Sequence, residues 1–120
     1  MRFLSIHSAR ETNTPPRPGL VEDVGRLMHR GFTEGWLISA EGCLPSALGA
    51  RVRRDGTLAT VTDGPFSETK EVVGGFAIFE AASKEEAVKL AHDFLAVIGD
   101  GACEIRPLYE SSAPATSAAA

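Results

Sequence analysis

The sequence predicts an α+β domain in which an antiparallel sheet carries two helices on one face. Three observations lead to this fold class: two segments with apolar residues at three-and-four spacing, about five short segments with strand character, and a tight hairpin near the middle of the chain. The expected order is strand, helix, strands, strand, helix, strand. A length of 120 residues and a hydrophobic content of 43% suit one such domain.

The N-terminal third is expected to form a strand, a loop and a helix. Residues 2–8 alternate as in a strand whose two faces differ. Leu4 and Ile6 lie on one face, and Phe3, Ser5 and His7 lie on the other. Three prolines and a glycine between residues 12 and 19 oppose regular structure and predict a loop. Apolar spacing then predicts a helix from Leu20 to about Gly35, where the glycine ends it.

The middle of the chain is expected to form three strands. Trp36 to Leu44 has strand character and is closed by Pro45. Two short alternating runs, Arg51 to Arg54 and Thr57 to Thr62, flank Asp55-Gly56. Because that dipeptide suits a type I′ turn, the pattern predicts a tight hairpin.

The C-terminal third is expected to repeat the strand and helix. Residues 75–81 predict a strand, and the helix that follows begins with a capping box formed by Ser83 and Glu86. Gly99 is expected to end this helix, and residues 103–109 to form the last strand. The buried stripe of the helix should consist of Ala87, Leu90, Ala91, Phe94, Leu95 and Ile98. Residues 111–120 contain only Ser, Ala, Pro and Thr, so a disordered tail is predicted.

The most specified segment follows the hairpin. Asp63-Gly64-Pro65 is a strong break, since proline sets its own φ and restricts the residue before it, and aspartate bonds nearby amides. Phe66 gives the turn an apolar anchor. Ionisable and donor side chains follow over residues 68–71, and Gly74-Gly75 precedes the strand, where a ligand or another backbone can come close.

This segment resembles the signature of the DGPF subgroup of the YCII-related proteins. The matching residues are Asp63-Gly64-Pro65-Phe66, Glu68-Thr69-Lys70-Glu71 and Gly75-Phe76, with similar order and spacing at residues 51–56, 83–91 and 104–107. The resemblance covers residues 1–109 and implies a domain over residues 1–110. It further implies a ferredoxin-like fold that pairs as a dimeric α/β barrel, and a family whose activity is mostly unassigned.

The resemblance also bears on partners and site residues. DGPF proteins are often associated with extracytoplasmic-function sigma factors, which implies a regulatory role. In the wider family a histidine and an aspartate are the suspected catalytic pair; Asp63 matches by motif position, whereas no histidine of this chain does.

Composition excludes several classes of protein. A net charge of −4 and a pI near 5.3 argue against a nucleic-acid-binding surface, and no apolar run approaches the roughly 20 residues of a membrane-spanning helix. The N-terminus does not resemble a signal peptide, so we expect a cytoplasmic protein. Cys43 and Cys103 have no metal-site spacing and are expected to be buried hydrophobes.

Apolar residues on the second sheet face predict a homodimer. Phe3, Leu108 and one side of the strand at Phe76 to Ile78 are expected to lie on the face without helices. Such a face is usually covered by the same face of a second copy. A closed two-sheet barrel would then hold a small-molecule ligand in its interior or mouth.

Four residues form the sharpest hypothesis for a site. If the sheet edges meet as the resemblance implies, His7, Glu104 and Arg106 converge with Asp63 near one barrel end, where His7 and Asp63 serve as acid or base and Arg106 holds an anion. The structural alternative is that Glu104 and Arg106 form an ion pair, that His7 is a half-buried strand residue, and that Asp63 caps its turn.

Phe66 and Lys70 complete the set of candidate ligand-binding residues. Lys70 lies between acidic neighbours and is either an activated amine or part of a solvated edge. His29 and His92 are expected on the solvated sides of the two helices. We find no motif for a phosphate, nucleotide, metal or other cofactor, so none is predicted.

Two functions from different classes remain open. One is an isomerase- or lyase-like enzyme acting on an acidic or aromatic metabolite, by analogy with other dimeric α/β barrels. The other is a noncatalytic protein that binds a ligand or a regulatory partner. A cavity lined by convergent ionisable groups would favour the enzyme, and an exposed apolar groove would favour the binding protein.

Overall fold

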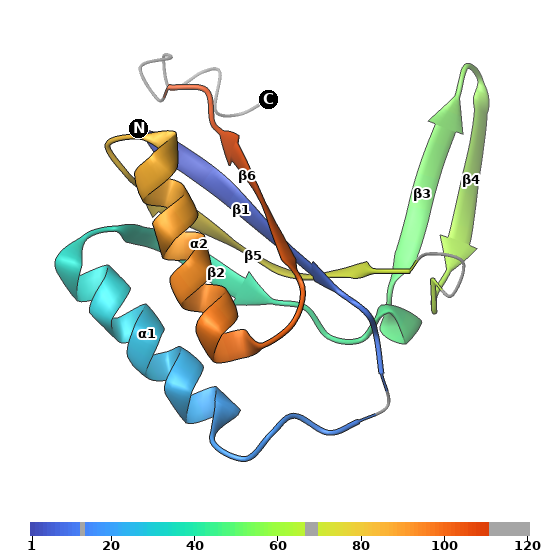
Figure 1. Ribbon diagram of the computed structural model, residues 1–120. Helices are drawn as coiled ribbons and strands as arrows, with labels where there is room; N and C mark the ends of the chain where they lie inside the picture. The colour runs from blue at the N-terminus through green and yellow to red at the C-terminus, as the bar shows by residue number, and fades with distance from the viewer. Residues whose placement is uncertain (13, 67–69, 111–120) are drawn as a thin grey trace.

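The computed structural model describes residues 1–12, 14–66 and 70–110. Its centre is a four-stranded antiparallel sheet in the order β2-β5-β1-β6, with both helices on one face (Figure 1). The sheet strands are β1 (Arg2–Ala9), β2 (Leu37–Gly42), β5 (Val72–Glu80) and β6 (Ala102–Pro107), and the helices are α1 (Leu20–Glu34) and α2 (Lys84–Ile98). The predicted α+β class and its ferredoxin-like arrangement are confirmed.

Both helices have the termini that their sequences predict. The αL residue Gly35 follows α1, and its N–H donates to the carbonyl of Gly31 at 2.9 Å. Ser83 precedes α2, and its side chain accepts a hydrogen bond from the N–H of Glu86 at 3.2 Å. Gly99 ends α2. Local capping chemistry therefore set the helix boundaries.

The core lies between the sheet and the helices. Phe79 of β5 is fully buried and contacts two aromatic rings, Trp36 and Phe94, at centroid separations of 6.1 and 5.7 Å. Phe3 is 2% exposed and belongs to the same cluster. In the predicted stripe of α2, Ala87, Ala91 and Phe94 are buried, whereas Leu90, Leu95 and Ile98 are partly buried.

The assignment of Phe3 to the face without helices was wrong. The strand alternates as predicted, but Phe3, Ser5 and His7 face the helices, and Leu4 and Ile6 face away. Alternation separates two sets of side chains but does not show which set meets the helices. In this strand the set that contains the aromatic side chain of Phe3 packs into the core.

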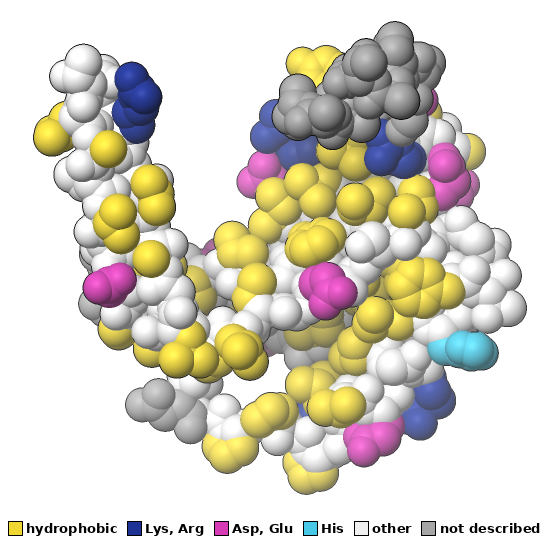
Figure 2. Space-filling model, turned by 180° about the vertical axis from the view of Figure 1, so that it is seen from behind, with side chains coloured by type: hydrophobic (Ala, Val, Ile, Leu, Met, Phe, Trp, Pro, Cys, Tyr) yellow, Lys and Arg dark blue, Asp and Glu magenta, His cyan; other side chains and the backbone are white. Residues whose placement is uncertain are grey.

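The face of the sheet without helices is termed the outer sheet face. Its apolar residues come from the two central strands, where Leu4 pairs with Ile78 and Ile6 pairs with Phe76. Seen from behind, the outer sheet face shows a broad group of hydrophobic side chains (Figure 2). Phe76 and Ile78 therefore lie on the outer sheet face, as predicted, whereas Phe3 does not.

A second, two-stranded sheet projects from the body as an arm (Figure 1). It consists of β3 (Ala50–Asp55) and β4 (Leu58–Asp63) and follows a short 3₁₀ turn, η1 (Ser46–Leu48). The predicted hairpin is confirmed, but its turn residues are Gly56 and Thr57, because Asp55 pairs with Leu58. Only Gly56 has a positive φ, of 61°, so the predicted type I′ turn does not form: that turn needs a positive φ at both central residues, and Thr57 is β-branched.

Strand β5 begins earlier than predicted and contains Gly74 and Gly75 rather than following them. A Cβ atom on Gly75 would lie 2.6 Å from the carbonyl oxygen of Glu41, so glycine lets β2 and β5 approach at this position. The proline-rich loop is irregular in its described residues. Arg17 in this loop donates to the carbonyl of Val97 at 2.9 Å and pairs with Asp23 at 3.0 Å.

Some expectations concern residues that lie outside the described part of the chain. These are the tail at 111–120 and the motif residues Glu68 and Thr69. Within the described ranges, no helix combines the length and the apolar character needed to cross a membrane.

Candidate functional site

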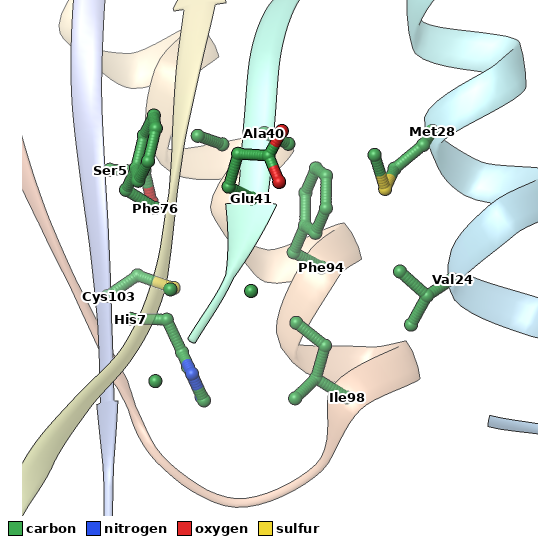
Figure 3. A pocket seen from close by; sticks show the side chains of 14 residues that line it. Ser5, His7, Val24, Met28, Ala40, Glu41, Phe76, Phe94, Ile98 and Cys103 are labelled. Carbon is green, nitrogen blue, oxygen red and sulfur yellow. The ribbon is translucent and has the colours of Figure 1, made fainter. Parts of the chain in front are cut away.

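A cavity of about 320 Å³ lies between the helices and the sheet. Its apolar wall comes mainly from the helices, and its polar groups come from the strands (Figure 3). The side chains that line it include Val24 and Met28 of α1, Phe94 and Ile98 of α2, Ser5 and His7 of β1, Glu41 of β2, and Cys103 of β6. We refer to it as the helix-side cavity.

His7 is the polar residue whose surroundings stand out. Its Nε2 atom is buried and has no hydrogen-bond partner within the described part of the chain. A Cβ atom on Gly101 would lie 2.8 Å from this Nε2 atom, and one on Gly74 would lie 3.1 Å from Nδ1. The imidazole therefore sits between two backbone segments that lack side chains, and neither position tolerates a larger residue without moving the ring.

The electrostatic state of His7 follows from this burial. Desolvation lowers its pKa below the ordinary value of 6.5, and the negative charge of Glu71 opposes that change by a smaller amount. Above pH 6.5 the imidazole is therefore neutral, with one nitrogen able to donate a hydrogen bond and the other able to accept one.

Cys103 is the cross-strand neighbour of His7 on the same face of the sheet. Such neighbours have Cβ atoms about 4.5–5.5 Å apart, so the thiol and the imidazole line the same part of the cavity. Cys103 is partly buried and contacts the core, in agreement with its predicted role, whereas Cys43 was expected to be buried and is exposed.

The turn at Asp63 to Phe66 is a structural junction at the base of the arm. The Gly64 N–H donates to the carbonyl of Gly49 at 2.9 Å, and the Phe66 N–H donates to Oγ of Ser46 at 3.2 Å. A Cβ atom on Gly64 would lie 1.6 Å from the carbonyl oxygen of Ser46, which leaves room for glycine alone. The Gly64-Pro65 peptide bond is cis.

Phe66 lies at this junction, and neither Phe66 nor Lys70 lines the helix-side cavity. The Phe66 ring is covered by the guanidinium of Arg51, with 4.4 Å between Cζ and the ring centroid. Phe66 also lines a surface hollow of about 680 Å³ with Leu44 and Leu48. Lys70 is exposed.

The predicted convergence of the candidate residues is not observed. Glu104 pairs with Ile6, so its side chain lies on the outer sheet face, opposite His7. Arg106 and Glu104 form an exposed ion pair at 3.3 Å, which matches the structural alternative. Asp63 ends β4 opposite Ala50, on the arm. Strand parity shows which side chains of one strand share a face. It does not show which face of a second strand lies on the same side of the sheet.

Other polar side chains do not add to a site. His29 and His92 are exposed on their helices, as predicted. Within the described ranges, no three His, Cys, Asp or Glu side chains come close enough to hold a metal ion.

The helix-side cavity was missed because Phe3 was assigned to the wrong face. His7 shares the face of Phe3, so placing Phe3 in the core would have placed His7 beneath the helices. The glycines at positions 74 and 101 are the remaining sequence signal for this site, since a glycine in or beside a strand often marks a place where another group comes close to the backbone. The sequence does not show that this group is the His7 side chain.

Comparison with known proteins agrees with the fold. The YCII-related domain matches residues 1–112 of this chain. An uncharacterized protein of Rhizobium meliloti (strain 1021) is 32% identical over 90 residues, which make up 74% of this chain and 73% of that protein. With a match over nearly the whole described chain and a relative above 30% identity, the protein belongs to the family with a YCII-related domain.

Proposed function

We propose that the protein binds a small, largely apolar molecule in the helix-side cavity, with His7 contacting one polar group of that molecule. One observation carries the proposal: the buried Nε2 atom of His7 has no hydrogen-bond partner within the described residues. A buried polar atom without a partner costs about 1–3 kcal/mol. Because Nε2 is packed against Gly101, a ligand recovers part of this energy when its entry shifts the imidazole enough to bond to this atom.

The size and lining of the cavity define the ligand class. About 320 Å³ lies at the small end of the range of small-molecule sites, roughly 300–1,000 Å³. The wall is formed largely by apolar side chains such as Met28, Phe94 and Ile98. An aromatic or branched aliphatic molecule with one carbonyl, hydroxyl or carboxyl group fits this description, because its apolar part is desolvated and its polar group reaches the imidazole.

The same geometry supports an isomerase- or lyase-like activity. A neutral imidazole can accept a proton from a carbon next to a carbonyl group and return it elsewhere. Its lowered pKa keeps His7 in the basic form at neutral pH. Cys103, the cross-strand neighbour of His7, also lines the cavity and is the group available for a second proton transfer.

Membership of the DGPF subgroup is part of the proposal. It is supported by the structural use of the motif, since Gly64 and the backbone of Phe66 join the arm to η1, and the contact of Gly64 with Ser46 leaves room for glycine alone. The noncatalytic alternative, a regulatory protein associated with an extracytoplasmic-function sigma factor, is favoured by the exposed apolar residues of the outer sheet face, where Phe76 is 38% exposed. Cytoplasmic location stays a prediction.

Ligand binding is tested by a thermal-shift screen of the wild type with aromatic and aliphatic acids, ketones and alcohols, each paired with its hydrocarbon analogue. A ligand that binds only the folded state raises Tm. We expect shifts for compounds with a polar group and smaller shifts for their analogues. His7→Gln should remove the difference within a pair, and Asp63→Asn should preserve it, since Asp63 lies on the arm.

Catalysis is tested with the compounds that bind. Each is incubated in D₂O with the wild type or His7→Gln, and deuterium incorporation next to the carbonyl group is followed by NMR. Exchange that needs His7 would support the enzyme, whereas binding without exchange would support the ligand-binding protein. Equal Tm shifts in wild type and His7→Gln for every pair would contradict the proposed site.

A further inference from the structure

The start of α1 and the end of α2 lie at the same end of the molecule, next to the helix-side cavity. Both lie at the end of the sheet where β1 runs into the proline-rich loop (Figure 1). Val24 of α1 and Ile98 of α2 line the cavity from the helix side, and His7 lines it from the strand side (Figure 3). These two helix ends therefore form part of the cavity wall.

The last turn of α2 leaves a carbonyl group for a partner outside the helix. In any α-helix the final four carbonyl oxygens have no N–H donor from the same helix. The carbonyl of Leu95 accepts from the N–H of Gly99 at 2.8 Å. The turn from Leu95 to Ile98 contains no basic residue that could balance the negative end of the helix dipole. The carbonyl of Val97 is thus available to a cationic donor from another segment.

Arg17 of the proline-rich loop is that donor. Its Nη2 atom donates to the carbonyl oxygen of Val97 at 2.9 Å, and its Nη1 atom lies 3.0 Å from Oδ2 of Asp23 in the first turn of α1. One guanidinium group contacts both helix ends because its nitrogens donate from a planar fork. We call this pair of contacts the Arg17 clamp.

The clamp acts on residues that are adjacent in sequence to the cavity wall. Asp23 precedes Val24, and Val97 precedes Ile98. Any movement of the clamped positions is therefore passed directly to two side chains of the wall. The helices are also linked by an ion pair between Arg30 and Asp93, but that pair is longer, at 3.9 Å, and both of its side chains are 54% exposed.

The clamp can open without unfolding the helices. The Arg17 side chain is 47% exposed and that of Asp23 is 35% exposed, so water competes for both contacts. Glycines with positive φ lie beside both anchor points: Gly19, with φ of 85°, precedes α1, and Gly99, with φ of 109°, follows α2. Such positions can absorb a change in backbone direction when two elements separate.

We propose that the Arg17 clamp is a gate for the helix-side cavity. When closed, it holds the start of α1 against the end of α2; when open, it lets these ends separate so that a molecule enters past Val24 and Ile98. A ligand that fills the cavity has to displace part of this wall as it enters, and closure behind it excludes water from His7. The inference assigns a regulatory element to the ligand site and in that sense rests on the proposed function.

Cys103 reports the opening of the gate without any ligand. It lines the cavity, whereas Cys43 is exposed and is removed by Cys43→Ser. In this background the full chain is treated with N-ethylmaleimide, and the labelling rate of Cys103 is followed by mass spectrometry. We expect Arg17→Met to raise this rate by about threefold to tenfold, because a charge-assisted hydrogen bond and a half-exposed ion pair are lost. Arg17→Lys keeps the charge without the fork and should give an intermediate rate.

Arg26→Met is the matched control. Arg26 pairs with the same carboxylate of Asp23 but belongs to α1 itself, so its removal leaves the link to α2 in place. The labelling rate of Cys103 should stay close to that of the reference protein. Urea unfolding of each variant gives the fraction of fully unfolded chain, in which Cys103 also reacts.

An acceleration in Arg17→Met that exceeds the rise in the unfolded fraction supports the gate. An unchanged rate in Arg17→Met, an equal acceleration in Arg26→Met, or an acceleration that the unfolded fraction accounts for would each overturn it. These outcomes are separate from the ligand screen. Faster labelling in Arg17→Met when no compound binds would support the gate and contradict the proposed function, whereas bound compounds with unchanged labelling would support the ligand site and overturn the gate.

Discussion

The carboxylate of Glu11 accepts two hydrogen bonds from Ser46, one from the backbone N–H at 2.7 Å and one from Oγ at 2.6 Å. The same Oγ accepts a hydrogen bond from the N–H of Phe66. Three segments that are distant in sequence, namely the end of β1, η1 and the turn after β4, are thereby joined at the base of the arm. This junction, the glycines and His7 each lead to predictions that can be measured.

The Glu11 junction should make stability depend on acidity. The hydrogen bonds from Ser46, first from its side chain and then from its backbone, lower the pKa of Glu11 below 4.5 in the folded state. A lowered folded-state pKa stabilises the protein above the unfolded-state pKa, and this contribution is lost as the pH falls through the folded-state value. Urea unfolding at pH 7 and at about pH 3.5 should show a smaller acid-induced loss for Glu11→Gln than for wild type. Equal losses in the two proteins would exclude this role.

Gly64→Ala should disrupt the base of the arm. Its methyl group would overlap the Ser46 carbonyl, so backbone must move and the free energy of unfolding should fall by more than about 2 kcal/mol. Gly49→Ala is the matched control, because its Cβ would meet the same carbonyl at an ordinary 3.5 Å. Chemical denaturation of both variants measures the difference; similar stabilities would show that the contact with Ser46 does not constrain position 64.

Two glycines on α1 should respond in opposite directions to the same substitution. Gly25→Ala meets nothing within 4 Å and should stabilise the protein by about 0.5–1 kcal/mol through helix propensity. Gly31→Ala would place a methyl group 2.7 Å from Cβ of Leu37 and 2.8 Å from the Trp36 ring, and should destabilise by about 1–3 kcal/mol. Thermal and urea unfolding of the pair would contradict this packing if both substitutions stabilised the protein.

His7 should titrate below its ordinary pKa, so that stability should fall as the pH drops below about 6.5. Between the unfolded-state pKa and the lower folded-state pKa, the unfolded state binds a proton at this residue and the folded state does not, so stability rises with pH and is lost as the pH falls through the folded-state pKa. NMR titration of the imidazole protons, with the His7 signal assigned by its absence in His7→Gln, measures the pKa directly. An apparent pKa above 6.5 would contradict the buried placement of the ring.

Gly101→Ala provides a structural check on the same residue. The added methyl group would lie 2.8 Å from Nε2 and also 2.8 Å from the carbonyl oxygen of Ser8, so both the imidazole and the end of β1 must shift, whereas Gly42→Ala, also at the cavity, meets nothing within 4 Å. The shift of the His7 NMR signals should therefore be larger in Gly101→Ala.

Much of the fold was predictable because its signals are local. Helical spacing from Leu20 and from Lys84, the Ser83 cap and the two terminating glycines depend on residues within a few positions of each other. The hairpin was found for the same reason, although its turn was placed one residue too early. Local propensity indicates that a turn exists more reliably than it indicates the register of the strands around it.

The candidate site was less predictable because it depends on which surfaces meet. The sequence by itself determined that His7 and Ile6 lie on opposite faces of β1, because side chains alternate along a strand. Only the tertiary structure decided that His7 lies beneath the helices with Cys103, that Glu104 lies on the opposite face, and that Asp63 stands on the arm. The physical reason is that periodicity is symmetric between the two faces of a strand, and packing of Phe3 and Phe79 against α2 breaks that symmetry.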